Sequence, residues 1–136
     1  MLNITELKNI HDDIEQELVE LEVIMSEETI NYPNFIHVFK KLDSMWDNHE
    51  KGEEVLFLKL KEAGYTVPYD KIVFAHGRLG KYKADLMKAL NSGSEFKMKT
   101  ALEKSGKKLI TYLREHIRLE NEVLYTLPED CCNNLI

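Results

Sequence analysis

The chain has 136 residues, enough to bury the core of one domain, and its 43% hydrophobic and 31% charged residues are ordinary for a soluble globular protein. Its formal net charge of −6 argues against nucleic acid or an anionic membrane as the main partner, because both need a basic patch. The N-terminus turns polar too soon for a secretory signal and no apolar stretch approaches the roughly 20 residues that span a bilayer, so we expect a cytoplasmic protein.

Glycine and proline are sparse, and they divide the chain into four helical segments. The breaks fall at Pro33, at Gly64, at residues 91–94 and at Pro128. Short connections between long helices favour antiparallel neighbours. The sequence predicts an all-α fold in which residues 1–136 form a single domain, an antiparallel up-down-up-down four-helix bundle with a short C-terminal tail. The expected helices cover about 5–28, 34–63, 70–90 and 95–127.

Along each segment the apolar residues recur alternately three and four positions apart, which is the spacing of a buried bundle seam. Histidine interrupts all four seams, and glutamate interrupts two of them. In chain order the expected seams are Ile4, Leu7, His11, Ile14, Leu18, Leu21 and Met25; Phe35, Phe39, Leu42, Trp46, His49, Glu53, Leu56 and Leu60; Ile72, His76, Leu79, Leu86 and Leu90; and Leu102, Gly106, Leu109, Leu113, His116, Glu120, Val123 and Leu127.

Four of the five histidines lie on these seams. Because only about two in seven helix positions belong to a seam, chance would place all four there less than about 1% of the time. His37 is off the stripe, and we expect it at the surface. His11 and His49 are separated from the connection between the first two helices by similar numbers of residues, so antiparallel packing would bring them to the same level of the bundle. The numbers match less well for the last two helices, since His116 lies 22 residues after position 94 and His76 only 15 before position 91, so either part of 94–100 is loop or the third helix tilts.

The two seam glutamates, Glu53 and Glu120, each follow a histidine by four residues. Residues four apart are neighbours on one helix face, so each His-x-x-x-Glu pair can direct two donor atoms at one point. A carboxylate inside an apolar bundle is costly unless it is paired or bound to a cation. Histidines from the other two helices complete the ring. We interpret the following residues as ligands of a buried metal site: His11, His49, Glu53, His76, His116 and Glu120.

Imidazole and carboxylate groups suit iron, manganese or zinc. Four histidines and two carboxylates are too many for one ion with open positions, and they suit two ions about 3.5–4 Å apart that share the carboxylates. The soft ligands that would indicate copper(I) or an iron–sulfur cluster are missing from the seams. The alternative is a metal-free bundle, because a single seam histidine or a single His-x-x-x-Glu pair is commonly structural.

Other polar residues have weaker claims to this site. Glu50 could reach a metal from the flank, but it is expected on a solvated helix face. Glu15 follows His11 by one turn, which makes it a candidate for a further ligand or a nearby base. Cys131 and Cys132 are adjacent in the tail and cannot join distant parts of the fold, so we expect them to be inert.

The sequence resembles the hemerythrin-like, or HHE cation-binding, family over nearly the whole chain. The resemblance rests on His11 and on three motifs, HEKGEEVLFLKL, FAHGRLG and YLREHIRLENEVLYTL. Ferritin-like bundles, the nearest confusable class, carry Glu-x-x-His instead. The resemblance implies two non-haem irons that can meet dioxygen, nitric oxide or peroxide. It also implies that the six residues above are their ligands, with Glu53 and Glu120 as bridges.

The chain departs from the oxygen-carrying hemerythrins at its third helix. Those proteins place a second histidine one turn away on this helix, whereas here Gly80 follows His76 by four residues and Ile72 precedes it by four. One iron would lose a ligand, which weakens the inference to a reversible oxygen carrier. The glycine would also leave room for a small molecule or water. In this respect the chain is more similar to the regulatory and iron-handling members.

Three functions are compatible with these residues. The favoured one is a binding or sensing module without catalytic residues, in which the di-iron site takes up dioxygen, nitric oxide or iron. The second is a di-iron enzyme that acts on peroxide or nitric oxide, or in iron–sulfur cluster repair. The third is a structural bundle without metal. A diatomic molecule, O2 or NO, is the expected partner, and neither a nucleic acid nor a membrane is expected. The sequence does not identify a protein partner.

Overall fold

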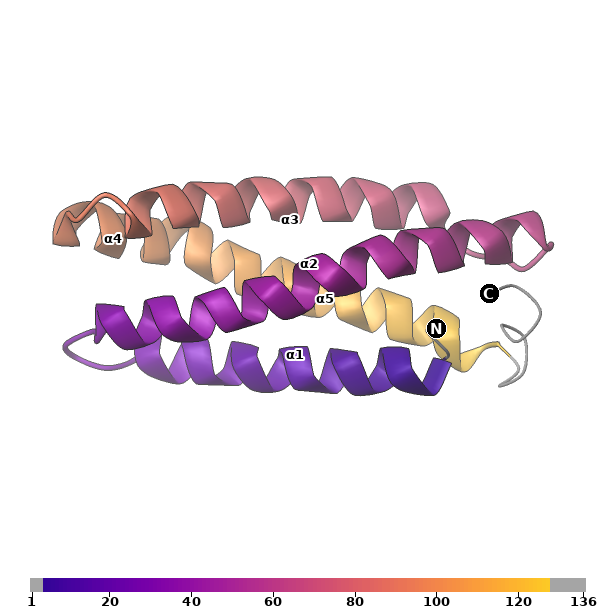
Figure 1. Ribbon diagram of the computed structural model, residues 1–136, viewed down its shortest axis with the longest axis horizontal. Coiled ribbons are helices and arrows are strands. Elements are labelled where there is room, and N and C mark those ends of the chain that lie inside the picture. The colour runs from indigo at the N-terminus through magenta and orange to yellow at the C-terminus, as the bar shows by residue number, and fades with distance from the viewer. Residues whose placement is uncertain (1–3, 128–136) are drawn as a thin grey trace.

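The computed structural model describes residues 4–127, and every regular element in this range is a helix (Figure 1). Three long helices are followed by a fourth column that consists of two α-helices joined by a π-helical segment. Since the described range contains no strand, the all-α prediction is confirmed there. In chain order the elements are α1 (Ile4–Met25), α2 (Tyr32–Glu62), α3 (Tyr69–Leu90), α4 (Glu95–Ala101), the π-helical η1 (Leu102–Gly106) and α5 (Lys107–Tyr125).

The helices lie side by side along the long axis of the molecule, and short connections join them at its two ends (Figure 1). Helix α1 packs on α2 and α5, while α3 packs on α2 and on the whole α4–η1–α5 column. The four columns thus enclose a common interior. None of the helices in residues 4–127 combines the length and the hydrophobicity that crossing a membrane would require.

The ends of α2 follow from local hydrogen bonding. The Asn31 side chain accepts a hydrogen bond from the Asn34 backbone N–H at 3.1 Å and caps the helix. Helix α2 therefore begins at Tyr32, two residues before the predicted start. Pro33 sits in the first turn, where a helix needs no backbone donor. At the other end, Gly64 adopts a φ of +96°, a left-handed conformation that favours glycine. The predicted break at this glycine is confirmed.

The last column begins directly after its connection, because Ser94 caps it. The Ser94 hydroxyl accepts a hydrogen bond from the Lys97 backbone N–H at 3.3 Å, and α4 starts at Glu95. The alternative that part of 94–100 is loop is therefore wrong beyond Ser94. Instead, η1 absorbs an extra residue in a wide turn before His116. Figure 1 also shows α4 extending past the end of α3. The last column therefore begins further from the level of His76 than α3 ends, and more residues are needed to reach His116.

Two apolar clusters fill the bundle, one on each side of a polar layer. The large core lies toward α4 and includes Ile14, Phe39 and Leu113. Every predicted seam residue with a described side chain is buried or half-buried, which confirms the heptad assignment. Along α1, His11 lies between the two clusters. The small core consists of Leu7, Leu56, Phe57, Leu60, Ile72 and Leu124.

Candidate metal centre

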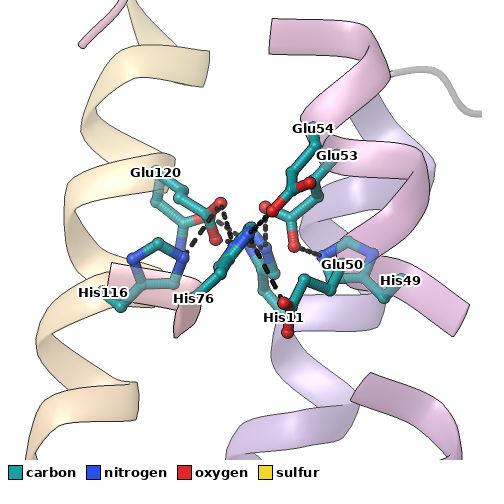
Figure 2. A network of polar contacts seen from close by, with 9 residues as sticks. His11, His49, Glu50, Glu53, Glu54, His76, His116 and Glu120 are labelled. Carbon is teal, nitrogen blue, oxygen red and sulfur yellow. Dashed lines mark hydrogen bonds and ion pairs between the residues drawn. The ribbon is translucent and has the colours of Figure 1, made fainter. Parts of the chain in front are cut away.

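The structure brings all six predicted ligands together in one polar layer between the two cores (Figure 2). Each is buried, with at most 5% of its surface exposed. Helices α1 and α3 each contribute one histidine, and α2 and α5 each contribute a histidine and a glutamate one turn apart. The polar layer consists of His11, His49, Glu53, His76, His116 and Glu120.

Glu53 lies between the imidazoles of α1 and α2. Its Oε1 is 2.6 Å from His49 Nε2, and its Oε2 is 3.8 Å from His11 Nε2. The two rings meet edge to face with their centroids 4.8 Å apart. One carboxylate and two imidazoles therefore converge on this side of the layer.

Glu120 faces the imidazoles of α3 and α5. Its Oε2 is 3.2 Å from His116 Nε2 and 3.7 Å from His76 Nε2. Its Oε1 lies 3.4 Å from His11 Nε2, so this carboxylate also reaches the other side of the layer. The His76 and His116 rings meet edge to face at 4.6 Å.

Two groups of donor atoms in this layer could each hold a cation, with the atoms of a group all within 4.8 Å of one another. Glu53 belongs to both groups, so they share a carboxylate. One group is Glu53, His76, His116 and Glu120, and the other is His11, His49 and Glu53.

The hydrogen-bonding state of these atoms tests whether they fit a metal. Among the described residues, the Nε2 atoms of all four layer histidines, Glu53 Oε2 and Glu120 Oε2 make no well-aligned hydrogen bond. This holds although His49 Nε2 lies 2.6 Å from Glu53 Oε1 and His116 Nε2 lies 3.2 Å from Glu120 Oε2. Buried polar atoms are normally paired, because each unpaired one costs about 1–3 kcal/mol. These six atoms are of the types that coordinate divalent cations. The residues present therefore fit a metal centre.

The pKa values of the two buried carboxyls, Glu53 and Glu120, are shifted in opposite directions. Burial raises the pKa of Glu53 well above its ordinary value, and the adjacent Glu120 carboxyl raises it further. Burial alone would also raise the pKa of Glu120, but the Glu53 carboxyl and the surrounding histidines hold it well below the ordinary value. Without a cation, the two carboxyls titrate as a pair in which a shared proton favours Glu53 over Glu120.

Two of the layer histidines have shifted pKa values. Burial lowers the pKa of His49 to about 4, with a further contribution from His11. Burial also opposes the charged form of His76, but the neighbouring Glu120 and Glu54 carboxylates outweigh it and raise the pKa of His76. His49 is thus a neutral imidazole near pH 7, the form that can bind a metal.

Two residues behind the layer were not predicted from the sequence. His11 Nδ1–H donates to Asn121 Oδ1 at 2.7 Å, and His76 Nδ1–H donates to Glu54 Oε1 at 2.9 Å. Such partners orient metal-binding imidazoles. The available signal was their position, since each directly follows a seam glutamate.

Glu50 differs from its predicted place on a solvated face. It is half-buried, and its Oε1 lies 3.8 Å from His76 Nδ1. Burial raises the pKa of Glu50. With Glu54 and His76 it forms a third group that could hold a cation, at the edge of the layer. The prediction was wrong because α3 covers this side of α2.

The remaining candidates lie elsewhere. Glu15 forms an ion pair with Arg114, with Oε1 2.8 Å from Nε, and no possible cation group within residues 4–127 includes it. His37 is exposed, as predicted. Cys131 and Cys132 lie outside the described residues.

Gly80 leaves open space one turn after His76. A Cβ built there would meet no atom of another residue's side chain or of another helix within 4 Å, as at the exposed Gly77. Ile72, one turn before His76, is buried in the small core.

A family model described as the hemerythrin HHE cation binding domain matches residues 2–127. No curated protein and no solved structure gives a significant match. The matched range includes every helix of the bundle and all six residues of the polar layer.

Proposed function

This chain belongs to the hemerythrin HHE cation-binding domain family, and on that premise we propose that it is a non-haem di-iron protein that binds or senses a small diatomic molecule. The observation that carries the proposal is the set of four imidazole Nε2 atoms and two carboxylate oxygens that are buried without hydrogen-bond partners in the described residues. Cations offer these atoms the partners that the protein does not supply.

The proposed ligands divide into two halves. His11 and His49 serve one ion, and His76 and His116 serve the other. Glu53 belongs to both possible cation groups, and Glu120 lies near imidazoles of both halves, which supports their roles as bridges. A pair of bridged irons supplies an open coordination position and redox chemistry for O2 or NO. The apolar cores on both sides of the layer exclude water from it.

Gly80 follows His76 by one turn, at a place where oxygen carriers have a further histidine, and its missing side chain would leave room for a small ligand. We place the diatomic molecule there. In this proposal the four columns form the up-down-up-down bundle of the family, as one domain of a cytoplasmic protein.

Loading with iron tests the proposal. The protein is purified without oxygen, supplied with Fe²⁺, freed of excess metal and analysed for iron content and absorption spectrum. We expect about two irons per chain and a spectral change on exposure to O2 or NO. A protein that takes up no metal and gains no stability from Fe²⁺ would contradict it and favour the structural alternative.

Two variants of α3 test the placement of the ligand. Gly80→Leu fills the open space and is expected to weaken NO binding at least about tenfold, because the side chain excludes the ligand. Gly77→Leu is the matched control, since Gly77 is exposed on the same helix and has equally free surroundings. Equal NO binding in both variants would refute this placement.

The same samples separate binding from catalysis. A spectral change that reverses when the gas is removed supports a binding or sensing protein. Sustained consumption of peroxide or NO over many turnovers would instead favour the enzyme. Iron–sulfur cluster repair has no specific support among the contacts described above.

A further inference from the structure

The residue after each seam glutamate holds a histidine of a neighbouring helix. Glu54 Oε1 accepts the hydrogen bond of His76, and Asn121 Oδ1 accepts that of His11. One step along a helix turns it by about 100°, so this residue faces the adjacent column rather than the centre. The segments HEKGEE and HIRLEN therefore share a pattern: a histidine, a glutamate four residues later, and directly after it a residue that accepts a hydrogen bond from a histidine of a neighbouring helix. We call these acceptors, Glu54 and Asn121, the tethers.

The tethers determine which nitrogen of each ring carries a proton. Because the acceptor lies at Nδ1, each of these bonds needs hydrogen on Nδ1, which makes Nε2 the nitrogen that can bind a metal ion in the layer. His49 and His116 have Nδ1 atoms without a hydrogen-bond partner among the described residues. Each half of the layer thus contains one tethered and one untethered histidine.

The tethers differ in one respect: Glu54 offers a carboxylate, and Asn121 offers a neutral amide. A carboxylate behind a metal-bound imidazole increases its strength as a ligand, whereas a neutral amide does so less. The half that contains His76 also has the larger donor group, with four residues against three.

We propose that Glu54 and Asn121 are positioning residues that hold His76 and His11 in the metal-binding tautomer, and that the carboxylate tether makes the His76–His116 half take up the first metal ion. This inference rests on the proposed function, since it assigns an order of filling to the same centre. It predicts that the two ions bind with different affinities although their histidine sets are alike.

Titration with Co²⁺ tests the order. Metal-free protein is titrated without oxygen, and the visible absorption of bound cobalt is recorded. Wild type is expected to bind in two steps. Glu54→Gln keeps a hydrogen-bond acceptor but loses the charge, so the first step should weaken about 10-fold or more. Asn121→Asp should strengthen the second step and bring the two affinities together.

A matched control removes a carboxylate that does not touch the layer. Asp47 is exposed on α2 and pairs with Lys51 at 3.6 Å, so Asp47→Asn makes the same change of charge as Glu54→Gln on the same helix. Both steps should remain as in wild type. An equal weakening by Asp47→Asn would show that only the overall charge matters, and would overturn the role of Glu54.

Nuclear magnetic resonance of the imidazole nitrogens in the metal-free protein tests the tautomers directly. His76 and His11 should carry hydrogen on Nδ1 in wild type, and His76 should keep it in Glu54→Gln but lose the preference in Glu54→Ala. An Nδ1 without hydrogen in either ring of the wild type would overturn the proposal.

The outcomes also separate this inference from the proposed function. If wild type binds two Co²⁺ ions but all variants behave alike, the tether roles fail and the metal centre stands. If wild type binds no metal, the proposed function fails, and the order of filling fails with it.

Discussion

The large core and the polar layer occupy the same heptad seams, yet the energetic consequences of burial differ between them. In the large core, residues such as Leu42 and Leu109 are stabilised by the exclusion of water alone, at about 25 cal/mol per Å² of apolar surface. In the polar layer, eight side-chain nitrogen and oxygen atoms have no hydrogen-bond partner among the described residues. The comparison indicates that packing in the core determines the fold, while the layer is completed by what it binds.

The largest expected effect comes from removing the carboxylate that contacts three layer histidines. Glu120→Ala should lower the iron content from about two per chain to none, because the two proposed ions would share this ligand. Helicity should be retained, since the core is unchanged. Metal analysis and circular dichroism measure the two properties. Glu115→Ala, an exposed change on the same helix, serves as the control, and full iron content in Glu120→Ala would refute the ligand assignment.

Metal loading should stabilise the protein by the next largest amount. At a free Fe²⁺ concentration about 1,000 times the dissociation constant, the free energy of unfolding should rise by about 4 kcal/mol. Urea denaturation under nitrogen, with and without metal, measures this difference. Glu120→Ala should show no gain, and a gain of equal size in that variant would point to binding elsewhere.

A cavity in the large core should produce the opposite pattern. Leu42 is buried two turns before His49, and Leu42→Ala should lower the free energy of unfolding by about 3 kcal/mol. The iron content per folded chain should stay at the wild-type value. Loss of iron in parallel with stability would show that the two regions are not separable.

Acid should weaken the metal-free layer through His49. The pKa of this residue is about 4 in the folded chain and about 6.5 when unfolded, so the unfolded state binds the proton first. Stability is therefore lost as the pH falls from about 6.5 to about 4, by up to about 3 kcal/mol. Urea denaturation at both pH values, compared with His49→Phe, isolates this contribution. An equal loss in both proteins would exclude His49 as its source.

The smallest effect is expected outside both regions. His37 is exposed on α2, and His37→Ala should change the free energy of unfolding by less than about 0.5 kcal/mol. Iron content should be unchanged. A measurable loss of iron would mean that the fifth histidine contributes to metal uptake.

The seam pattern predicted the six layer residues because a buried ionisable side chain interrupts an apolar repeat visibly. Glu53 and Glu120 are conspicuous at positions where leucine is expected. Asn121 and Glu54 lie one residue off the seam, where polar residues are ordinary, so their roles depend on which helix lies beside them. That neighbour is known only from the three-dimensional arrangement.

The helix boundaries show the same limit. The glycine and proline breaks placed most ends within a few residues, but α1 ends at Met25 rather than at about 28. The wide turn of η1 was not predicted from residues 102–106, because Leu102, Glu103 and Lys104 suit an α-helix, and Gly106 disfavours an α-helix without indicating a π-turn. The choice between a π-turn and an α-turn is made by the contacts that the column must reach at both of its ends.

The position of η1 has a consequence for how this protein can change over generations. A wide turn can gain or lose a single residue and leave the helix after it aligned. Because η1 precedes His116 by ten residues, α4 and the connection before it can vary in length without rotating α5. The end of the bundle that carries α4 is thus where mutation can add new contacts at little risk to the centre.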